Sequence, residues 1–106
     1  MEDMVKIVVS IQPEYGAKLR EAIGAAGGGK IGNYSFCSFT TKGIGRFKPN
    51  EKAHPFVGGS GTLDEIEEEK IELTCEKNIA ARIIKAIRDN HPYEEPVIDV
   101  YPLLPL

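Results

Sequence analysis

Apolar and polar positions divide the chain into short segments that repeat with two different periods. Residues 4–11 are nearly all apolar and rich in β-branched side chains, which is typical of a largely buried strand. Residues 77–90 instead place apolar side chains every three or four positions, which predicts an amphipathic helix that ends at His91-Pro92. The apolar face of this helix consists of Ile79, Ala80, Ile83, Ile84 and Ile87.

A second helix is predicted between Gln12 and the three glycines at 27–29. Pro13 suits the first helical position, where its missing N–H costs no hydrogen bond, and Glu14 is favoured there by the helix dipole. The apolar stripe of this helix consists of Tyr15, Leu19, Ala22, Ile23 and Ala26. The glycines end the helix because glycine adopts the left-handed cap conformation without steric penalty.

Three further segments show strand or loop patterns. Residues 33–42 are aromatic and rich in Ser and Thr, which predicts a strand, and the Gly-Ile-Gly at 43–45 predicts a bulge or bend after it. Residues 48–61 contain two prolines and three glycines and predict a loop, and loops of this length are often functional in a small domain. Residues 97–101 predict a last strand before Pro102.

The segment 62–75 fits two structures. Thr62 and Glu65 have the spacing of a helix capping box, and local propensity mildly favours a helix in the first half. As a strand, the apolar residues from Ile71 to Cys75 would alternate with polar neighbours. The residues alone leave both alternatives open.

If this segment is a strand, the order of elements is βαββαβ. That order predicts a single α+β domain over residues 1–106 with the ferredoxin-like sandwich fold, in which two helices cover one face of a four-stranded antiparallel sheet. The other sheet face needs a cover, and self-association is the usual one for a domain with a second apolar sheet face. A chain of 106 residues suffices for such a core without a disulfide or a metal.

Composition and charge exclude several classes of protein. The formal net charge is −3, so the basic surface of a nucleic-acid-binding protein is not expected. No apolar run approaches the roughly 18 residues that span a bilayer, and the acidic start at residues 1–4 lacks the basic region of a signal peptide. We therefore expect a cytoplasmic protein that binds neither membranes nor nucleic acids.

Residues with distinctive chemistry are few. Cys37 and Cys75 form no CxxC pair, and we expect two buried thiols inside strands rather than a metal or redox site. The dense glutamates at 65–72 fit a solvated face. His54 lies in the predicted loop and His91 at a helix end, where each is either structural or a metal ligand.

The most distinctive segment is HPYEEP at 91–96. Its two prolines restrict the backbone, so it is either a rigid turn into the last strand or a loop that presents His91, Tyr93 and Glu94. No spacing typical of nucleophilic catalysis is recognisable, which makes an enzyme the least favoured function.

Several motifs occur together in the order known from one family. They are IGNYSFCSF at 31–39, GIGRFKP at 43–49, KIE at 70–72, HPYEEP at 91–96 and DVYPL at 99–103. From Val5 to Leu103 the sequence resembles the insert domain of the bacterial Nif-three-like proteins of the YqfO type. HPYEEP followed by a strand that ends in Tyr-Pro-Leu is the most specific part of this resemblance.

The resemblance implies a fold like that of CutA and the PII signalling proteins. It therefore implies that 62–75 is a strand, paired with 33–47 as a long hairpin. It also implies a homo-oligomer, with a trimer favoured, built by pairing exposed sheet edges. The two-metal centre of the full-length family lies in two halves that flank the insert, and no position of this chain corresponds to its ligands, so its hydrolase-like activity is not expected here.

Together these observations favour a non-enzymatic binding, regulatory or assembly module with an unidentified small-molecule ligand or protein partner. Its candidate contacts are Tyr34, Ser35, Cys37, His54, His91, Tyr93 and Glu94. The alternative, by analogy with CutA-like proteins linked to cation tolerance, is a protein that binds a divalent metal ion. Its candidate ligands are Cys37, His54, His91 and Glu95. A purely structural role in assembly, without any ligand, is a further alternative.

Overall fold

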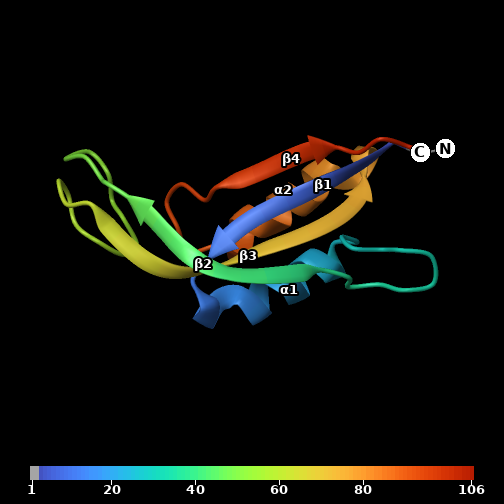
Figure 1. The fold of residues 1–106 in the computed structure, drawn as a ribbon, viewed down its shortest axis with the longest axis horizontal. Helices are drawn as coiled ribbons and strands as arrows, with labels where there is room; N and C mark the ends of the chain where they lie inside the picture. Colours follow the sequence, from blue (N-terminus) through green and yellow to red (C-terminus); the bar gives the residue numbers. More distant parts are fainter. Residues whose placement is uncertain (1–2) are drawn as a thin grey trace.

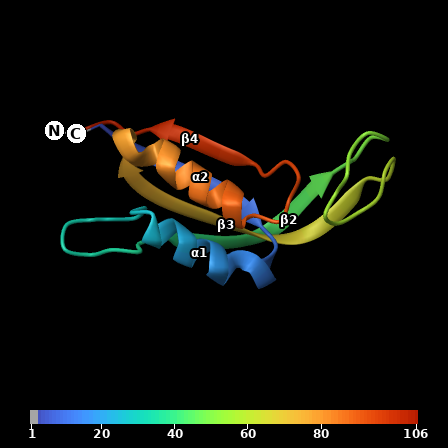
Figure 2. The same ribbon diagram turned by 180° about the vertical axis from the view of Figure 1, so that it is seen from behind.

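In the computed structural model, which describes residues 3–106, one antiparallel sheet is covered on one face by two helices (Figures 1 and 2). The strands are β1 (Met4–Ile11), β2 (Phe39–Phe47), β3 (Asp64–Glu76) and β4 (Ile98–Pro102). The helices are α1 (Gly16–Ala25) and α2 (Ala80–Asn90), preceded by the short 3-10 helices η1 (Pro13–Tyr15) and η2 (Lys77–Ile79). The sheet order β2-β3-β1-β4 with the chain order βαββαβ confirms the predicted ferredoxin-like sandwich.

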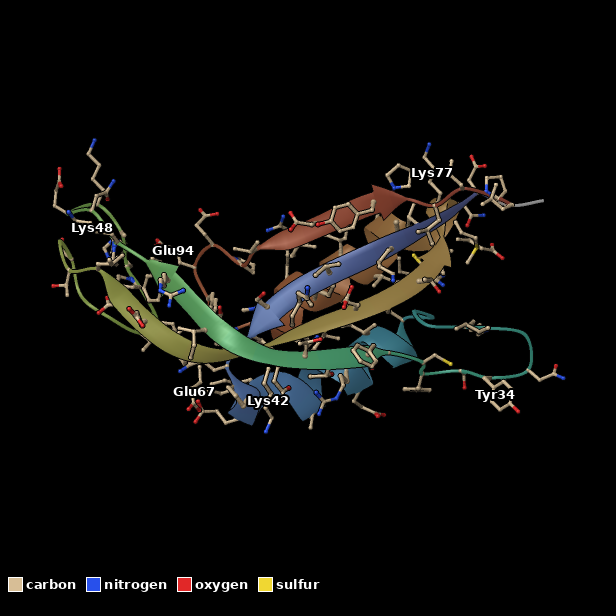
Figure 3. The ribbon with its side chains drawn as sticks, in the orientation of Figure 1. Tyr34, Lys42, Lys48, Glu67, Lys77 and Glu94 are labelled. Atoms are coloured by element: carbon tan, nitrogen blue, oxygen red, sulfur yellow. The ribbon has the colours of Figure 1, made fainter. Side chains whose placement is uncertain are left out.

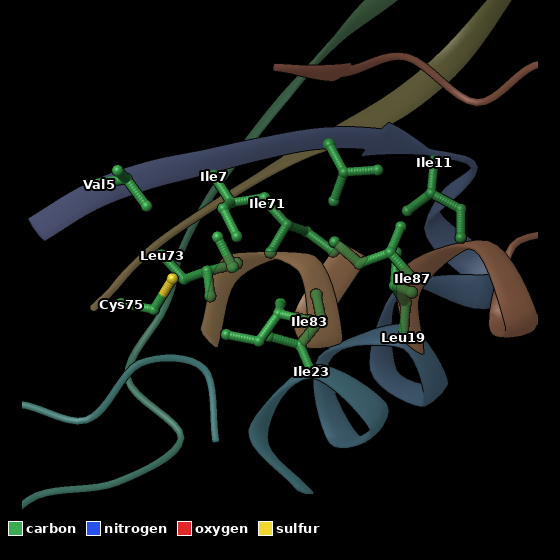
Figure 4. Close-up of a cluster of buried hydrophobic side chains, with 12 residues drawn as sticks. Val5, Ile7, Ile11, Leu19, Ile23, Ile71, Leu73, Cys75, Ile83 and Ile87 are labelled. Carbon is green, nitrogen blue, oxygen red and sulfur yellow. The ribbon is translucent and has the colours of Figure 1, made fainter. Parts of the chain in front are cut away.

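The hydrophobic core lies between the sheet and the two helices (Figure 4). It consists of Val5, Ile7, Val9, Ile11, Leu19, Ile23, Ile71, Leu73, Cys75, Ala80, Ile83 and Ile87. The helical members recur at three- and four-residue spacing, which confirms the apolar stripes predicted for α1 and α2. Each fully buried aliphatic side chain stabilises the fold by roughly 1.5–3 kcal/mol. This layer is therefore the stable body on which the loops are mounted.

β3 shows which alternative holds for the segment that fitted both a helix and a strand. It pairs with the whole of β1 on one side and the whole of β2 on the other. These ladders bury Ile71, Leu73 and Cys75 against the helices, so tertiary pairing outweighs the local capping-box signal. The strand implied by the family resemblance is confirmed.

β2 begins later than predicted. The strand expected over 33–42 is wrong for residues 33–38, which belong to a projecting loop at 30–38 that we call the arm (Figure 1). Within the arm, Ile31 and Tyr34 exchange two 2.9 Å backbone hydrogen bonds around a tight turn. Phe36 has a φ of +60°. Neither feature is compatible with a strand, although the aromatic and hydroxyl side chains imitate strand composition.

Of the bulge or bend expected at 43–45, the bulge is wrong. The register between β2 and β3 is unbroken from Phe39 to Phe47, so both glycines of the Gly-Ile-Gly are ordinary ladder positions. Cys75 is buried in β3 as predicted. Cys37 is not inside a strand, because the arm leaves it half-buried in a loop.

The sheet face opposite the helices carries side chains of mixed character. The register places on it Lys6, Val8, Ser10, Phe39, Thr41, Lys70, Glu72, Thr74, Asp99 and Tyr101. Phe39 and Tyr101 are exposed, but charged residues lie between them. The expectation of a second apolar sheet face is therefore wrong, because this face mixes apolar with charged and hydroxyl side chains. The edge strands of the sheet are β2 and β4.

The molecule is elongated, with extents of 48 × 23 × 22 Å. The arm lies at the same end of the molecule as the start of β1 and the C-terminal residues (Figure 1). The loop at 48–63, which we call the cavity loop, lies at the other end with the tip of the β2–β3 hairpin. Neither helix in residues 3–106 has the length and apolar character needed to cross a membrane.

Candidate ligand site

The HPYEEP turn at 91–96 is fixed to the end of β1 by its histidine. His91 Nε2 lies 2.8 Å from the carbonyl oxygen of Ser10, and His91 Nδ1 accepts a 3.2 Å hydrogen bond from the backbone N–H of Tyr93. Because a carbonyl only accepts and an N–H only donates, the ring proton is on Nε2. Burial lowers the pKa of His91, against the opposing effects of the Ser10 hydrogen bond and the Glu68 carboxylate. The ring is therefore held in its neutral form.

Tyr93 connects this turn to β3. Its hydroxyl donates a 2.9 Å hydrogen bond to Glu68 Oε2. Burial, together with this bond to a carboxylate, raises the pKa of Tyr93, so the hydroxyl keeps its proton at neutral pH. His91 and Tyr93 also pack edge to face, with ring centroids 4.5 Å apart. The turn is thus anchored to β1 through His91 and to β3 through Tyr93.

The Gly-Ile-Gly of β2 makes room for Glu68. Gly43 and Gly45 lie on the same face of the hairpin as Glu68 and carry no side chains. A Cβ atom at Gly45 would collide with Glu68 Oε1, whereas one at Gly43 would meet nothing within 4 Å. The glycine at 45 therefore allows the close approach of a carboxylate, which explains this motif without a bulge.

The cavity loop folds back onto the turn. The ring of Phe56 lies between two others, with its centroid 5.5 Å from that of Tyr15 and 6.4 Å from that of Tyr93. The backbone N–H of His54 donates a 2.9 Å hydrogen bond to Glu94 Oε1. These contacts connect the cavity loop to the turn and to the start of α1, which is more order than the glycines and prolines of this loop suggest.

A cavity of about 410 Å³ lies between the cavity loop, the hairpin tip and the turn. This volume is in the range of small-molecule sites. Its lining includes Arg46, Phe47, Lys48, Pro49, Phe56, Glu68, Tyr93, Glu94, Glu95 and Val97. Figure 3 shows Lys48 and Glu94 at this end of the molecule. The lining combines aromatic and aliphatic surface with a few charged groups, as is typical of such sites.

The remaining predicted contacts lie at the opposite end, in the arm (Figure 3). Tyr34 is 74% exposed and Ser35 is exposed. The arm is held by a 3.0 Å hydrogen bond from the N–H of Cys37 to the carbonyl of Gly29 and by the ring of Phe36, which lies against Gly24 of α1. One chain therefore brings His54, His91, Tyr93 and Glu94 of the predicted contacts together, and it does not bring Tyr34, Ser35 and Cys37 to them.

The four predicted metal ligands are dispersed as well. Cys37 lies in the arm, and both ring nitrogens of His91 already have partners. His54 and Glu95 lie at the cavity end. Across residues 3–106, no group of three or more His, Cys, Asp or Glu side chains is placed to hold a metal ion.

Several residues of this site are absent from the sequence-based candidates, notably Phe56, Glu68 and Val97. A signal for this end of the hairpin was present in the motif GIGRFKP at 43–49, which supplies Arg46, Phe47, Lys48 and Pro49 to the lining. Glu68 could not be recognised from the chain alone. It is one of several glutamates in β3, and only the register shows that it faces the glycines.

Comparison with known proteins places these features in context. The chain matches no family model. It is 45% identical over 102 residues to the "GTP cyclohydrolase 1 type 2 homolog" of Halalkalibacterium halodurans, a match that covers 96% of this chain and 27% of that protein. The Bacillus subtilis protein of the same name is 40% identical over 102 residues, with the same coverage. The chain thus spans about a quarter of the length of the curated relatives it matches.

Among solved structures, the Bacillus cereus protein related to NIF3 matches with a TM-score of 0.85 and 41% identity, over 96% of this chain and 26% of that one. The chain is a homologue of one domain of the NIF3-related proteins. The divalent ion tolerance protein CutA1 from Ehrlichia chaffeensis has a TM-score of 0.69 at 12% identity, over 100% of this chain and 86% of that one. The GlnK–ATP complex of Bacillus subtilis has a TM-score of 0.66 at 17% identity, over 97% and 84%. The resemblance drawn from the motifs and the CutA- and PII-like fold are both confirmed.

Proposed function

We propose that this domain is a binding module and that a small molecule occupies the cavity between the cavity loop and the turn. The link from His91 through Tyr93 to Glu68 carries this proposal. It fixes one wall of the cavity with hydrogen bonds that are already made, so little ordering is left for a ligand to impose. The ring of Phe56 adds an apolar surface at the opposite loop.

The same groups support binding rather than turnover. A general base or nucleophile needs a pKa near the working pH and a free lone pair directed at the substrate. The pKa of Tyr93 is shifted away from neutrality, and both ring nitrogens of His91 are engaged in fixing the turn. The name of the relatives refers to proteins of which this chain matches about a quarter, and the proposal does not depend on their activity.

We further infer that several copies of the domain assemble, with a trimer favoured. Phe39 is 68% and Tyr101 is 50% exposed on the open sheet face. Lys6 and Lys70 alternate there with Glu72 and Asp99, a pattern that another copy of the same face could complement. The edge strands β2 and β4 also offer backbone groups for pairing.

Native mass spectrometry of the protein as purified from the producing cells tests this function. We expect an oligomer that carries a bound small molecule. Val97→Trp places a large ring in the cavity lining and should remove the bound mass, whereas Val100→Trp, at an exposed position of β4 that does not line the cavity, should keep it. A bare wild-type protein, or a bound mass that survives Val97→Trp, would contradict the proposal.

A divalent-metal site is the second candidate. The backbone N–H of His54 donates a hydrogen bond to Glu94, which precedes Glu95, so a histidine and two carboxylates belong to the same end of the molecule. Because the described chain groups no three such side chains, the site would have to be completed by another copy. Stoichiometric zinc binding that is lost in His54→Ala would support it, and weak, non-stoichiometric binding would contradict it.

A further inference from the structure

We infer that the cavity takes a small organic cation with an aromatic or apolar body, such as an aromatic amine. This inference rests on the proposed function of the cavity and adds the chemical class of its ligand. It follows from the aromatic rings of the lining and from the distribution of charge around them.

The rings supply the surface for the apolar body. Phe47, Phe56 and Tyr93 all line the cavity. Phe56 and Tyr93 adjoin at a centroid distance of 6.4 Å and an interplanar angle of 35°, so their faces are tilted rather than closed against each other. Aromatic faces attract both apolar groups and cations, because the ring quadrupole is negative above and below the plane.

The charge of the lining favours a cation. Glu68 lies half-buried beside Tyr93, and its Oε2 accepts the tyrosine hydroxyl. In the part of the chain that the structure describes, Glu68 Oε1 has no hydrogen-bond donor, so it can accept one from a ligand. Glu94 and Glu95 add two more carboxylates to the lining. A ligand ammonium would therefore meet acceptors and negative potential together.

The two cations of the lining do not offset this pattern. Arg46 Nε lies 3.5 Å from Glu65 Oε1, so its charge is already paired outside the cavity. Lys48 is exposed in the cavity loop, and water screens it as it screens the exposed carboxylates of Glu94 and Glu95. Glu68 is half-buried and is therefore the charge of the lining that water screens least, so a phosphate or carboxylate ligand would have to approach it without a free, fixed cation. For the same reason ATP, which the GlnK complex contains, is not expected here.

Three indole compounds of nearly equal size separate the charge of the ligand from its shape. They are tryptamine, a cation, tryptophol, which is neutral, and indole-3-propionate, an anion. Because the chain contains no tryptophan, the fluorescence anisotropy of each compound reports its binding without a protein background. We expect tryptamine to bind about tenfold more tightly than tryptophol, and indole-3-propionate to bind most weakly.

Glu68→Gln tests the residue that carries the inference. Glutamine can still accept the hydrogen bond of the Tyr93 hydroxyl, so the contact that fixes the cavity wall is kept while the negative charge is removed. We expect tryptamine to lose its tenfold advantage over tryptophol in this variant and to keep it in Glu67→Gln. Glu67 is the matched control, because it is the neighbouring exposed glutamate of β3 on the other face.

The outcomes separate this inference from the proposed function. If indole-3-propionate binds most tightly, or if Glu68→Gln leaves the tryptamine advantage unchanged, the cation assignment is overturned. Anion binding that Val97→Tyr abolishes, a substitution that fills the cavity lining without adding an indole, would overturn the assignment and leave the cavity as a ligand site. If none of the three compounds binds, the cation assignment is also overturned, and the mass spectrum of the purified protein then decides independently on the proposed function.

Discussion

The two ends of this molecule carry its two most distinctive motifs and use them in different ways. At one end, HPYEEP is joined by side-chain hydrogen bonds to β1 and β3 and closes a cavity with the cavity loop. At the other end, the arm with IGNYSFC projects from the body, where backbone hydrogen bonds and the contact of Phe36 with Gly24 hold it and Tyr34 is exposed. An unusual motif therefore shows that its segment has a special local structure. Whether it also forms a ligand site depends on where its side chains lie.

Glycine acts at both ends, but against different neighbours. At the cavity end, Gly45 admits the flexible carboxylate of Glu68. At the arm, Gly29 has a φ of +81° and admits the backbone of Cys37, which cannot move aside. The first contact shapes a ligand site and the second fixes the path of the chain. Substitutions at the two ends should therefore differ in size and in what they disturb.

The largest effect is expected at the arm. Gly29→Ala adds backbone strain and a collision with the Cys37 backbone, so the free energy of unfolding should fall by about 3 kcal/mol or more. Gly32 also has a positive φ but nothing within 4 Å of an added Cβ, so Gly32→Ala should cost only about 1 kcal/mol. Urea unfolding of both variants measures the difference. Equal losses would contradict the role assigned to the Gly29–Cys37 contact.

A smaller effect is expected beneath the cavity. Gly45→Ala should displace the Glu68 carboxylate and break its bond to Tyr93, which costs about 1–2 kcal/mol of stability for a bond to a charged group. Gly43→Ala, in open space on the same face, should be neutral or slightly stabilising. Chemical unfolding measures stability, and tryptamine anisotropy measures the cavity. Unchanged tryptamine binding in Gly45→Ala would contradict the role of the Gly45–Glu68 contact in shaping the cavity.

A comparable effect is expected from acid. Because burial lowers the pKa of folded His91 below its unfolded value of about 6.5, the unfolded chain binds more protons as the pH falls below that value. Stability from this group is therefore complete above about pH 6.5 and declines below it, by at most about 1.4 kcal/mol per pH unit.

Unfolding measured from pH 8 to pH 5 isolates this contribution. The stability advantage of the wild type over His91→Gln should be largest at high pH and shrink as the pH falls. His54→Gln is the control, because His54 is exposed and its ring has no role in fixing the turn. If the stability advantage of the wild type did not change with pH, this would contradict a neutral His91 ring that makes two hydrogen bonds.

The smallest effect on global stability is expected from the cavity loop. Phe56→Ala removes the ring between Tyr15 and Tyr93 and should cost only about 0.5–1.5 kcal/mol, since the ring is half exposed. Limited proteolysis should nevertheless cleave residues 48–63 much faster. Leu63→Ala, at an exposed position of the same loop, should leave the cleavage rate unchanged. Equal cleavage rates in both variants would show that Phe56 does not hold the loop.

The segments with a regular hydrophobic period were predictable from the sequence. The buried strand at 4–11 and the helix at 77–90 have clear periods, and burial of Ile7, Ile83 and Ile87 follows from them. The segment 62–75 needed the family resemblance, because its capping-box spacing competes with the strand pattern. The start of β2 was missed because Phe36 and its neighbours have strand composition but a loop backbone.

The candidate site was only half predictable. His91, Tyr93 and Glu94 stood out because HPYEEP is an unusual sequence, and all three belong to the turn beside the cavity. Their partner Glu68 is chemically identical to the other glutamates of β3, and only its register with the glycines distinguishes it. The arm residues stood out equally in the sequence but lie at the other end. An unusual motif does not show which other motifs lie near it in the folded chain.

Amide chemical-shift mapping by NMR tests the central claim, that the cavity end rather than the arm is the ligand site, most directly. Isotope-labelled protein would be titrated with a library of small fragments, and the perturbed amides placed on the fold. We predict that binding fragments shift the amides of Phe47, Phe56, Tyr93 and Val97 and leave those of Tyr34 and Cys37 unchanged. Shifts that gather at residues 30–38, or that spread without a centre at the cavity, would contradict it.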